Sequence, residues 1–407
     1  MLLLIALSAK LEQLLSSHQE EPAVTAGTEE RQPLTSIEIC AGAGGQAVGL
    51  HNAGFRHLAL LEIDKFACKT LRTNVRDHPE WAGCEVVEGD VIDVDPFAHQ
   101  QLAKFALKPG ELDLLAGGVP CPPFSVAGRQ LGAEDERDLF PRMRQLVNLL
   151  RPKAVMIENV KGILEKKFQG YRDEIVAELK GYGYDFCGWE LIEACRYGVP
   201  QLRPRAILVM IDKKFTVDAK FEWPVGDDSV FTVAEALDQT MSERCQPYGA
   251  RGQAALEKWR DHAKGRGVAP TLVGGSKKHG GADLGPSRAK AAWAELGIDG
   301  MGVANDPDRC DPDRDLFRKN GPMLTVEQAA IIQGFPRHWH FEGGKTARYR
   351  QVGNAFPPPV AEAVGRAIAA VLRPEGNQED LVPAARQEAE LSPASADHVG
   401  DLQTAVV

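Results

Sequence analysis

Short apolar runs alternate with amphipathic stretches along the first half of the chain. Apolar residues three or four positions apart predict helices over 46–52, 137–150 and 169–181. Nearly continuous apolar strands separated by helices are typical of a mainly parallel sheet covered on both faces. We therefore expect an α/β fold. The runs predicted as strands are 36–40, 57–61, 85–88, 112–116, 153–157, 184–194 and 206–211.

The alternation stops after Asp212, and glycine, proline and charge rise until about Met323. This part holds a basic helical stretch over 251–266 and a glycine-rich basic loop over 270–281. An Asp/Pro/Arg cluster over 305–318 is typical of an exposed loop. The change in pattern indicates a second, less regular domain.

A strand-free pattern of helices closes the ordered part of the chain. A helix is predicted over 324–334, with Thr325 as N-cap and Gln328 three positions later. Residues 351–359 are predicted as a stiff loop that leads into a helix over 360–372. The expected segments are an N-terminal helix and linker over 1–35, an α/β domain over 36–212, a less regular second domain over 213–322, a C-terminal segment over 323–373, and an acidic disordered tail over 374–407.

The net charge of −10 is carried almost wholly by the two ends of the chain. Residues 1–35 have a net charge of −3 and residues 374–407 one of −6, which leaves −1 for 36–373. Residues 251–290 hold nine basic and three acidic side chains. A locally basic segment of this kind is compatible with binding to nucleic acid, although the whole chain is acidic.

The eight cysteines are scattered and no CxxC pair occurs, so neither a disulfide framework nor a zinc site is indicated. We expect no metal and a reducing, cytoplasmic compartment. The apolar start, 1–7, is short and runs into Lys10, which favours an amphipathic helix over a signal peptide. No apolar stretch is long enough to span a membrane.

Polar and glycine residues follow three of the predicted strands at the edge where such sheets bind ligands. A glycine turn over 41–45 lets a ligand approach the backbone closely. Glu62 is placed to accept hydrogen bonds from ribose hydroxyls, or alternatively stands next to a helix cap made by Asp64. Asp90 is placed to accept from an exocyclic amine. Together these positions favour a nucleoside site.

A second set of candidate residues points to nucleophilic chemistry. Cys121 stands among three prolines on a turn after the strand 112–116, so it is either a presented nucleophile or an inert buried thiol. Glu158 follows the strand 153–157 and is either a cap or a functional acid whose burial would raise its pKa. Arg203 and Arg205 alternate, so in an extended chain they share a face suited to an anion or a carbonyl oxygen.

These stretches, taken together, resemble the DNA (cytosine-5)-methyltransferases of bacterial type. The resemblance covers about 36–212 and 323–373. The matching blocks stand in the same order as in the family. They are Glu38–Gly45, Glu62, Asp90, Gly118–Ser125, Glu158–Val160, Gln201–Arg205, Leu324–Pro336 and Gln351–Asn354.

The resemblance implies a catalytic domain over 36–212, whose Rossmann-like sheet binds S-adenosylmethionine, a smaller target-recognition domain over 213–322, and a segment over 323–373 that returns to the catalytic domain. It also implies methyl transfer to C5 of a cytosine flipped out of duplex DNA. It implies a chain that acts as a monomer near the nucleoid, with a restriction or defence nuclease as a possible partner. The implied catalytic residues are Cys121, Glu158, Arg203 and Arg205. The implied cofactor residues are Cys40, Ala41, Gly42, Gly44, Gly45, Glu62, Ile63, Asp90, Val91, Pro120, Asn354 and Ala355. The DNA contacts are expected at Ser125, Gln201, Lys277 and Lys278.

The chain departs from the family at three positions. Cys40 stands where a phenylalanine is usual, Pro122 where glutamine is often found, and Glu38 where aspartate is more common. None of these removes a catalytic group. Two other functions stay open: a methyltransferase of the same fold acting on a tRNA cytosine, and a DNA-binding module without activity.

Overall fold

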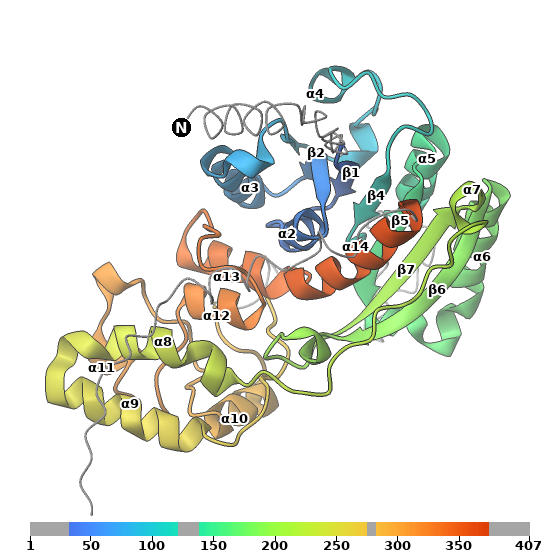
Figure 1. Cartoon of the computed structure of the whole chain (residues 1–407). Helices are drawn as coiled ribbons and strands as arrows, with labels where there is room; N and C mark the ends of the chain where they lie inside the picture. The colour runs from blue at the N-terminus through green and yellow to red at the C-terminus, as the bar shows by residue number, and fades with distance from the viewer. Residues whose placement is uncertain (1–31, 121–137, 275–281, 374–407) are drawn as a thin grey trace, which may run out of the picture. The chain divides into compact units, whose positions relative to one another are not determined.

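A seven-stranded sheet forms the centre of the computed structural model, which describes residues 32–120, 138–274 and 282–373 (Figure 1). The strand order is β3-β2-β1-β4-β5-β7-β6. All neighbours are parallel except β7, which runs antiparallel to β5 and β6. The strands are β1 (Leu34–Ile39), β2 (Phe55–Glu62), β3 (Glu85–Glu88), β4 (Leu114–Gly117), β5 (Ala154–Val160), β6 (Tyr184–Glu193) and β7 (Pro204–Asp212).

Helices cover both faces of this sheet. The α-helices are α2 (Gly45–Asn52), α3 (Lys65–Asp77), α4 (Gln100–Ala103), α5 (Phe140–Leu150), α6 (Gln169–Gly181), α7 (Lys213–Thr216), α8 (Val233–Cys245), α9 (Gly249–Ala263), α10 (Ser287–Glu295), α11 (Pro312–Asp315), α12 (Val326–Ile332), α13 (Lys345–Asn354) and α14 (Pro358–Leu372). Successive strand residues point to opposite faces, so Leu115 packs with α5 and α6 while Leu114 packs with α2 and α14. This accounts for the apolar character of the central strands.

The last helix, α14, lies against α2 on the sheet (Figure 1). Glycines allow the close approach. A Cβ on Gly49 would lie 2.6 Å from the Cβ of Ala361, and a Cβ on Gly365 would lie 2.9 Å from that of Ala53. The end of the described chain therefore packs beside the first helix of the sheet, which brings the turn between α13 and α14 close to the start of α2.

The segment between β7 and α12 consists of helices joined by irregular chain. No strand occurs in its described part, and α8 and α9 pack side by side (Figure 1). Trp259 and Trp293 are buried in its core. The cluster 305–318 was expected as an exposed loop, and positions 307–309, 311 and 313 are exposed, but it also contains α11 and the fully buried Asp315, so that expectation holds only in part. Asp315 is buried because its carboxylate accepts from the backbone N–H groups of Asn305 and Asp311.

Two further sequence expectations can be compared with the helices. The capping box of α12 is confirmed, because Thr325 and Gln328 hydrogen-bond reciprocally. Residues 351–354 are the last turn of α13 and not a loop, which corrects the sequence prediction. Gly353 lies in this turn and packs closely against the backbone of Gly274. No helix in the described part of the chain combines the length and apolar character that a membrane span requires.

Candidate active site

A cavity of about 460 Å³ opens at the carboxyl ends of the parallel strands. The chain leaves β1 toward β2 on one side and continues from β4 to β5 on the other, so β1 and β4 flank the topological switch point where open α/β sheets bind ligands. Seven of the expected cofactor residues line the cavity. They are Cys40, Ala41, Gly42, Glu62, Ile63, Asn354 and Ala355.

Glu62 joins the ends of β1 and β2. Its Oε2 accepts from the N–H of Gly42 at 2.7 Å, and its Oε1 accepts from the N–H of Asp64 at 2.7 Å. Burial raises the pKa of Glu62, while these backbone donors favour its ionised form. Asp64 in turn caps α3. The structure thus combines the two sequence interpretations: Asp64 is the cap, and Glu62 faces the cavity.

Cys40 occupies a left-handed backbone conformation with φ of 53°, which is uncommon outside glycine. Burial and the nearby carboxylates raise the pKa of its thiol far above the usual range. The thiol is therefore neutral and acts as a small apolar wall of the cavity. This is the position where the family usually carries an aromatic ring.

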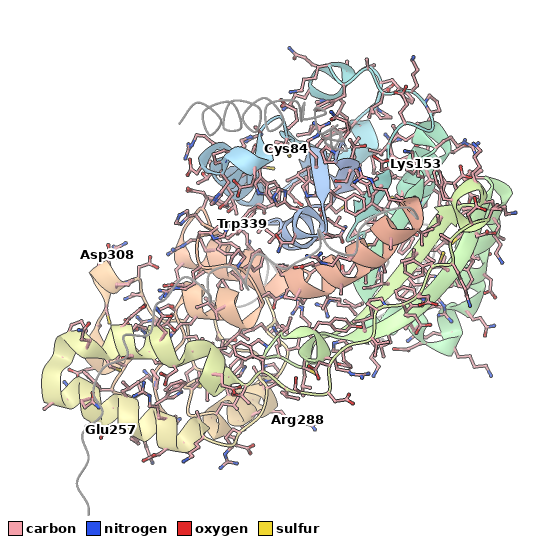
Figure 2. The ribbon with its side chains drawn as sticks, in the orientation of Figure 1. Cys84, Lys153, Glu257, Arg288, Asp308 and Trp339 are labelled. Carbon is pink, nitrogen blue, oxygen red and sulfur yellow. The ribbon has the colours of Figure 1, made fainter. Side chains whose placement is uncertain are left out.

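The other five expected cofactor residues do not line the cavity in the structure: Gly44, Gly45, Asp90, Val91 and Pro120. Asp90 accepts from the N–H of Ile92 and so caps the short turn Val91–Asp93. Trp339 lies beside α2 (Figure 2), and a Cβ on Gly44 would lie 2.7 Å from its ring. The Nε1 of Trp339 donates to Ala43 O at 2.9 Å. Packing against Trp339 therefore explains the glycine at position 44.

Two buried polar side chains that line the cavity, Glu38 and Gln46, were not among the site residues expected from the sequence. The Oε2 of Glu38, with a side chain only 1% exposed, has no hydrogen-bond partner among the described residues. The same holds for both polar atoms of Gln46, which is 3% exposed. An acid inside the apolar run of β1 was a signal available in the sequence. Gln46 gave no such signal, because a polar residue in the first turn of a helix is ordinary.

Glu158 and Arg205 form a largely buried ion pair, with Arg205 Nε 2.8 Å from Glu158 Oε1. Burial raises the pKa of Glu158, and the charges of Arg205 and Arg203 oppose this rise. A Cβ on Gly118 would lie 3.0 Å from Glu158 Oε2, so the absence of a side chain lets the carboxylate lie against the chain. Glu158 also lines the cavity.

The strand end that carries Glu158 also holds the start of the cysteine loop. Asn159 Nδ2 donates to Val119 O at 2.9 Å, which fixes the chain two residues before Cys121. Cys121 and Ser125 themselves lie outside the described residues, as do Lys277 and Lys278. The described geometry therefore brings Glu158, Arg205 and the entry to the Cys121 loop together at one edge of the cavity.

Arg203 differs from the expectation of a shared substrate-binding face with Arg205. Its guanidinium is 1% exposed and donates to the carbonyl oxygens of Leu272, Gly353 and Ala355 over 2.8 to 2.9 Å. Gln201, expected to contact DNA, is fully buried. Its Oε1 accepts from Leu272 N–H at 2.7 Å and its Nε2 donates to Gln333 Oε1 at 2.8 Å. These contacts give both side chains a positioning role in the interior.

The same junction contains a close contact between two backbones. A Cβ on Gly353 would lie 2.6 Å from the Cα of Gly274, and a Cβ on Gly274 would lie 2.6 Å from Arg350 O. The segment that leads to the basic loop 275–281 thus rests on the last turn of α13. That turn also provides Asn354 to the cavity.

Comparison with known proteins identifies the family of this chain. A family model described as C-5 cytosine-specific DNA methylase matches residues 34–370. The Type II methyltransferase M.NaeI of Lentzea aerocolonigenes is 48% identical over 353 residues, covering 86% of this chain and 78% of that protein. M.NgoMIV of Neisseria gonorrhoeae, also a Type II methyltransferase, is 45% identical over 351 residues, covering 84% and 99%.

Solved structures support the fold. A methyltransferase encoded within an Escherichia coli prophage superposes with a TM-score of 0.57 at 23% identity, over 83% of this chain and 99% of that one. The resemblance stated from the sequence and the expected α/β fold class are confirmed. The match over nearly the whole described chain shows that it belongs to the C-5 cytosine-specific DNA methylase family.

Proposed function

We propose that the chain transfers a methyl group from S-adenosylmethionine to C5 of a cytosine in duplex DNA. The observation that carries this proposal is the buried pair of Glu158 and Arg205 at the edge of a nucleoside-sized cavity. The same strand end fixes the chain that enters the Cys121 loop. A carboxyl group and a guanidinium beside the chain that leads to Cys121 match the needs of cytosine, whose ring offers N3, an exocyclic amine and O2 to these groups.

The chemistry requires the cytosine C5 to become nucleophilic. The Cys121 thiolate forms a bond to C6, which shifts an electron pair toward C5. Glu158, whose pKa is raised by burial, binds N3 and the exocyclic amine and supplies a proton at N3. Arg205 binds O2 and stabilises the charge that develops there. After methylation, the C5 proton passes to solvent water, its bonding electron pair re-forms the C5–C6 double bond, and the Cys121 sulfur leaves as a thiolate. N3 returns its proton to Glu158, which restores the aromatic ring.

The cavity residues fit S-adenosylmethionine, which supplies the methyl group when bound. The Glu62 carboxylate would accept from the ribose hydroxyls, and the exposed Ile63 would pack on the adenine. The unpartnered Glu38 Oε2 and the Gln46 amide show that the cavity presents polar groups still lacking a partner. Asn354 and Ala355 close the cavity from the end of α13.

The nature of the relatives extends the proposal to a restriction–modification role. Both bacterial relatives compared above are Type II methyltransferases. By analogy, this chain would protect host DNA from a cognate nuclease. Segment 213–322, which rests on the active-site elements through Leu272 and Gly274, would read the target sequence.

The proposal is tested by trapping the covalent bond to the base. Bisulfite sequencing of DNA from a host that expresses the chain first gives the target site. An oligonucleotide with 5-fluorocytosine at that site should then form a stable protein–DNA adduct, because fluorine cannot leave as a cation. Cys121→Ala should abolish the adduct while DNA binding persists. Methyl transfer to tRNA in place of duplex DNA would overturn the choice of substrate.

A further inference from the structure

Gln46 is a buried amide that lacks partners on both sides of its functional group. It is the second residue of α2 and is 3% exposed, and neither its Oε1 nor its Nε2 has a hydrogen-bond partner among the described residues. Leaving a buried amide unsatisfied costs about 1–3 kcal/mol for each polar group. Gln46 lines the cavity, so a ligand in that cavity is the available source of both missing partners.

The start of α2 has a further property that limits what this ligand group can be. The N-cap residue is Gly44, which has no side chain to accept from the first-turn N–H groups. Uncapped N–H groups and the helix dipole favour a negative charge at this end. Gly45 packs on the backbone of Phe356, so the first turn lies against the loop that closes the cavity.

We infer that Gln46 recognises the amino-acid end of S-adenosylmethionine. That end carries an ammonium and a carboxylate side by side. The Gln46 carbonyl oxygen accepts from the ammonium, and the Gln46 NH₂ donates to the carboxylate, which also faces the start of α2. Adenine likewise offers a donor and an acceptor, but it has no negative charge to match the helix end. This inference rests on the proposed function.

The inference makes Gln46 a specificity residue for the cofactor. A protein with an apolar residue at this position would still bind the adenosine part through Glu62 and Ile63, but would make no hydrogen bond from position 46 to the amino-acid end. The amide therefore makes the cavity bind S-adenosylmethionine and its product more tightly than adenosine-derived thioethers that lack the amino acid. We expect the selectivity between these two groups of ligand to depend on position 46.

Calorimetric binding of two ligands tests this. S-adenosylhomocysteine has the amino-acid end, and 5′-methylthioadenosine lacks it. Gln46→Met keeps the length of the side chain and removes both polar atoms. The substitution should lower the affinity for S-adenosylhomocysteine about 10-fold or more, since the lost hydrogen bonds are to charged groups. The affinity for 5′-methylthioadenosine should stay nearly unchanged. Asn52→Leu, at the exposed end of the same helix, is the matched control and should change neither affinity.

The outcomes are distinguishable. Equal weakening of both ligands would show that the amide serves adenosine or the shape of the cavity, and unchanged affinities would show that it binds neither; each result overturns the inference. Wild-type protein that binds neither ligand would instead overturn the proposed function. If Gln46→Met does not fold, Gln46→Glu gives a second test. Its added negative charge should favour decarboxylated S-adenosylmethionine over S-adenosylhomocysteine, and an unchanged preference would contradict the inference.

Discussion

Arg205 Nε lies 2.8 Å from Glu158 Oε1, across the antiparallel pair formed by β5 and β7. The strand pairing sets this distance, because Val160 of β5 lies opposite Arg205 and places Glu158 two residues away on the same face. The acid and the base-binding cation of the proposed mechanism are thus held by main-chain register. Their relative position does not depend on the loop that carries Cys121.

Replacement of the acid should affect turnover more than binding. Glu158→Gln keeps the shape and a hydrogen-bond acceptor for Arg205 but removes the proton donor, so kcat should fall by roughly 10²-fold or more. Single-turnover methylation measures this. Affinity for S-adenosylhomocysteine should stay close to wild type, as a control for the cavity. Unchanged turnover would reduce Glu158 to a structural partner of Arg205.

Replacing Arg203 should mainly lower the stability of the fold, whereas replacing Arg205 should mainly lower turnover. Arg203→Met leaves the carbonyl oxygens of Leu272, Gly353 and Ala355 without their donor, which should cost about 3 kcal/mol or more in the free energy of unfolding. Arg203→Lys should restore part of this stability and retain turnover.

Arg205→Lys should show the opposite behaviour. It keeps a positive charge beside Glu158 but loses the planar fork, so kcat should fall with little loss of stability. Urea unfolding and turnover are measured on the same preparations. Equal loss of turnover in Arg203→Lys and Arg205→Lys would contradict the positioning role of Arg203.

His57 should make the fold sensitive to acid. It is fully buried between Ser36 Oγ and Ala47 O, each 2.8 Å from a ring nitrogen, and burial lowers its pKa to about 3. The unfolded chain binds a proton at His57 below its ordinary pKa of 6.5, but the folded chain does not until about 3. The free energy of unfolding should therefore fall as pH drops from 6.5, by about 1.4 kcal/mol per pH unit from this group alone.

The measurement compares wild type with His57→Gln by urea unfolding between pH 6 and pH 4.5. The glutamine variant should show the shallower dependence on pH. His51 also stacks on Trp81 and has a lowered pKa, but it is present in both proteins and cancels in the comparison. Parallel curves would show that His57 does not contribute to the acid sensitivity.

The basic loop should contact the DNA backbone. Lys277 and Lys278 follow Gly274, which rests on α13 beside the cavity. The double replacement Lys277→Ala/Lys278→Ala should weaken DNA binding on any sequence and flatten the slope of log K against log salt by about one to two units. Target specificity should persist, because phosphate contacts position the protein without reading bases. A slope equal to that of wild type would place the phosphate contacts elsewhere.

The sequence was sufficient for the sheet and for the residues at its strand ends, because apolar strands and their terminal acids are local signals. It was insufficient where burial decides the role. Arg203 and Arg205 are the same residue type and stand two positions apart. Yet Arg203 donates to three carbonyl oxygens inside the protein, whereas Arg205 pairs with Glu158. The sequence also gave no sign that Gly353, in the last turn of α13, lies against Gly274, which is far away in the chain.

The contact between Gly274 and Gly353 limits how this protein can be recombined with its relatives. A side chain at either position would overlap the other segment, so the two glycines must be exchanged or retained together. A chimera that takes its target-reading segment from another methyltransferase should therefore keep this chain up to Gly274 and resume its own sequence before α12. A junction inside 269–274 would disturb the hydrogen bond that Arg203 donates to Leu272 O. A segment with a new sequence preference is thus most readily inserted between Gly274 and α12.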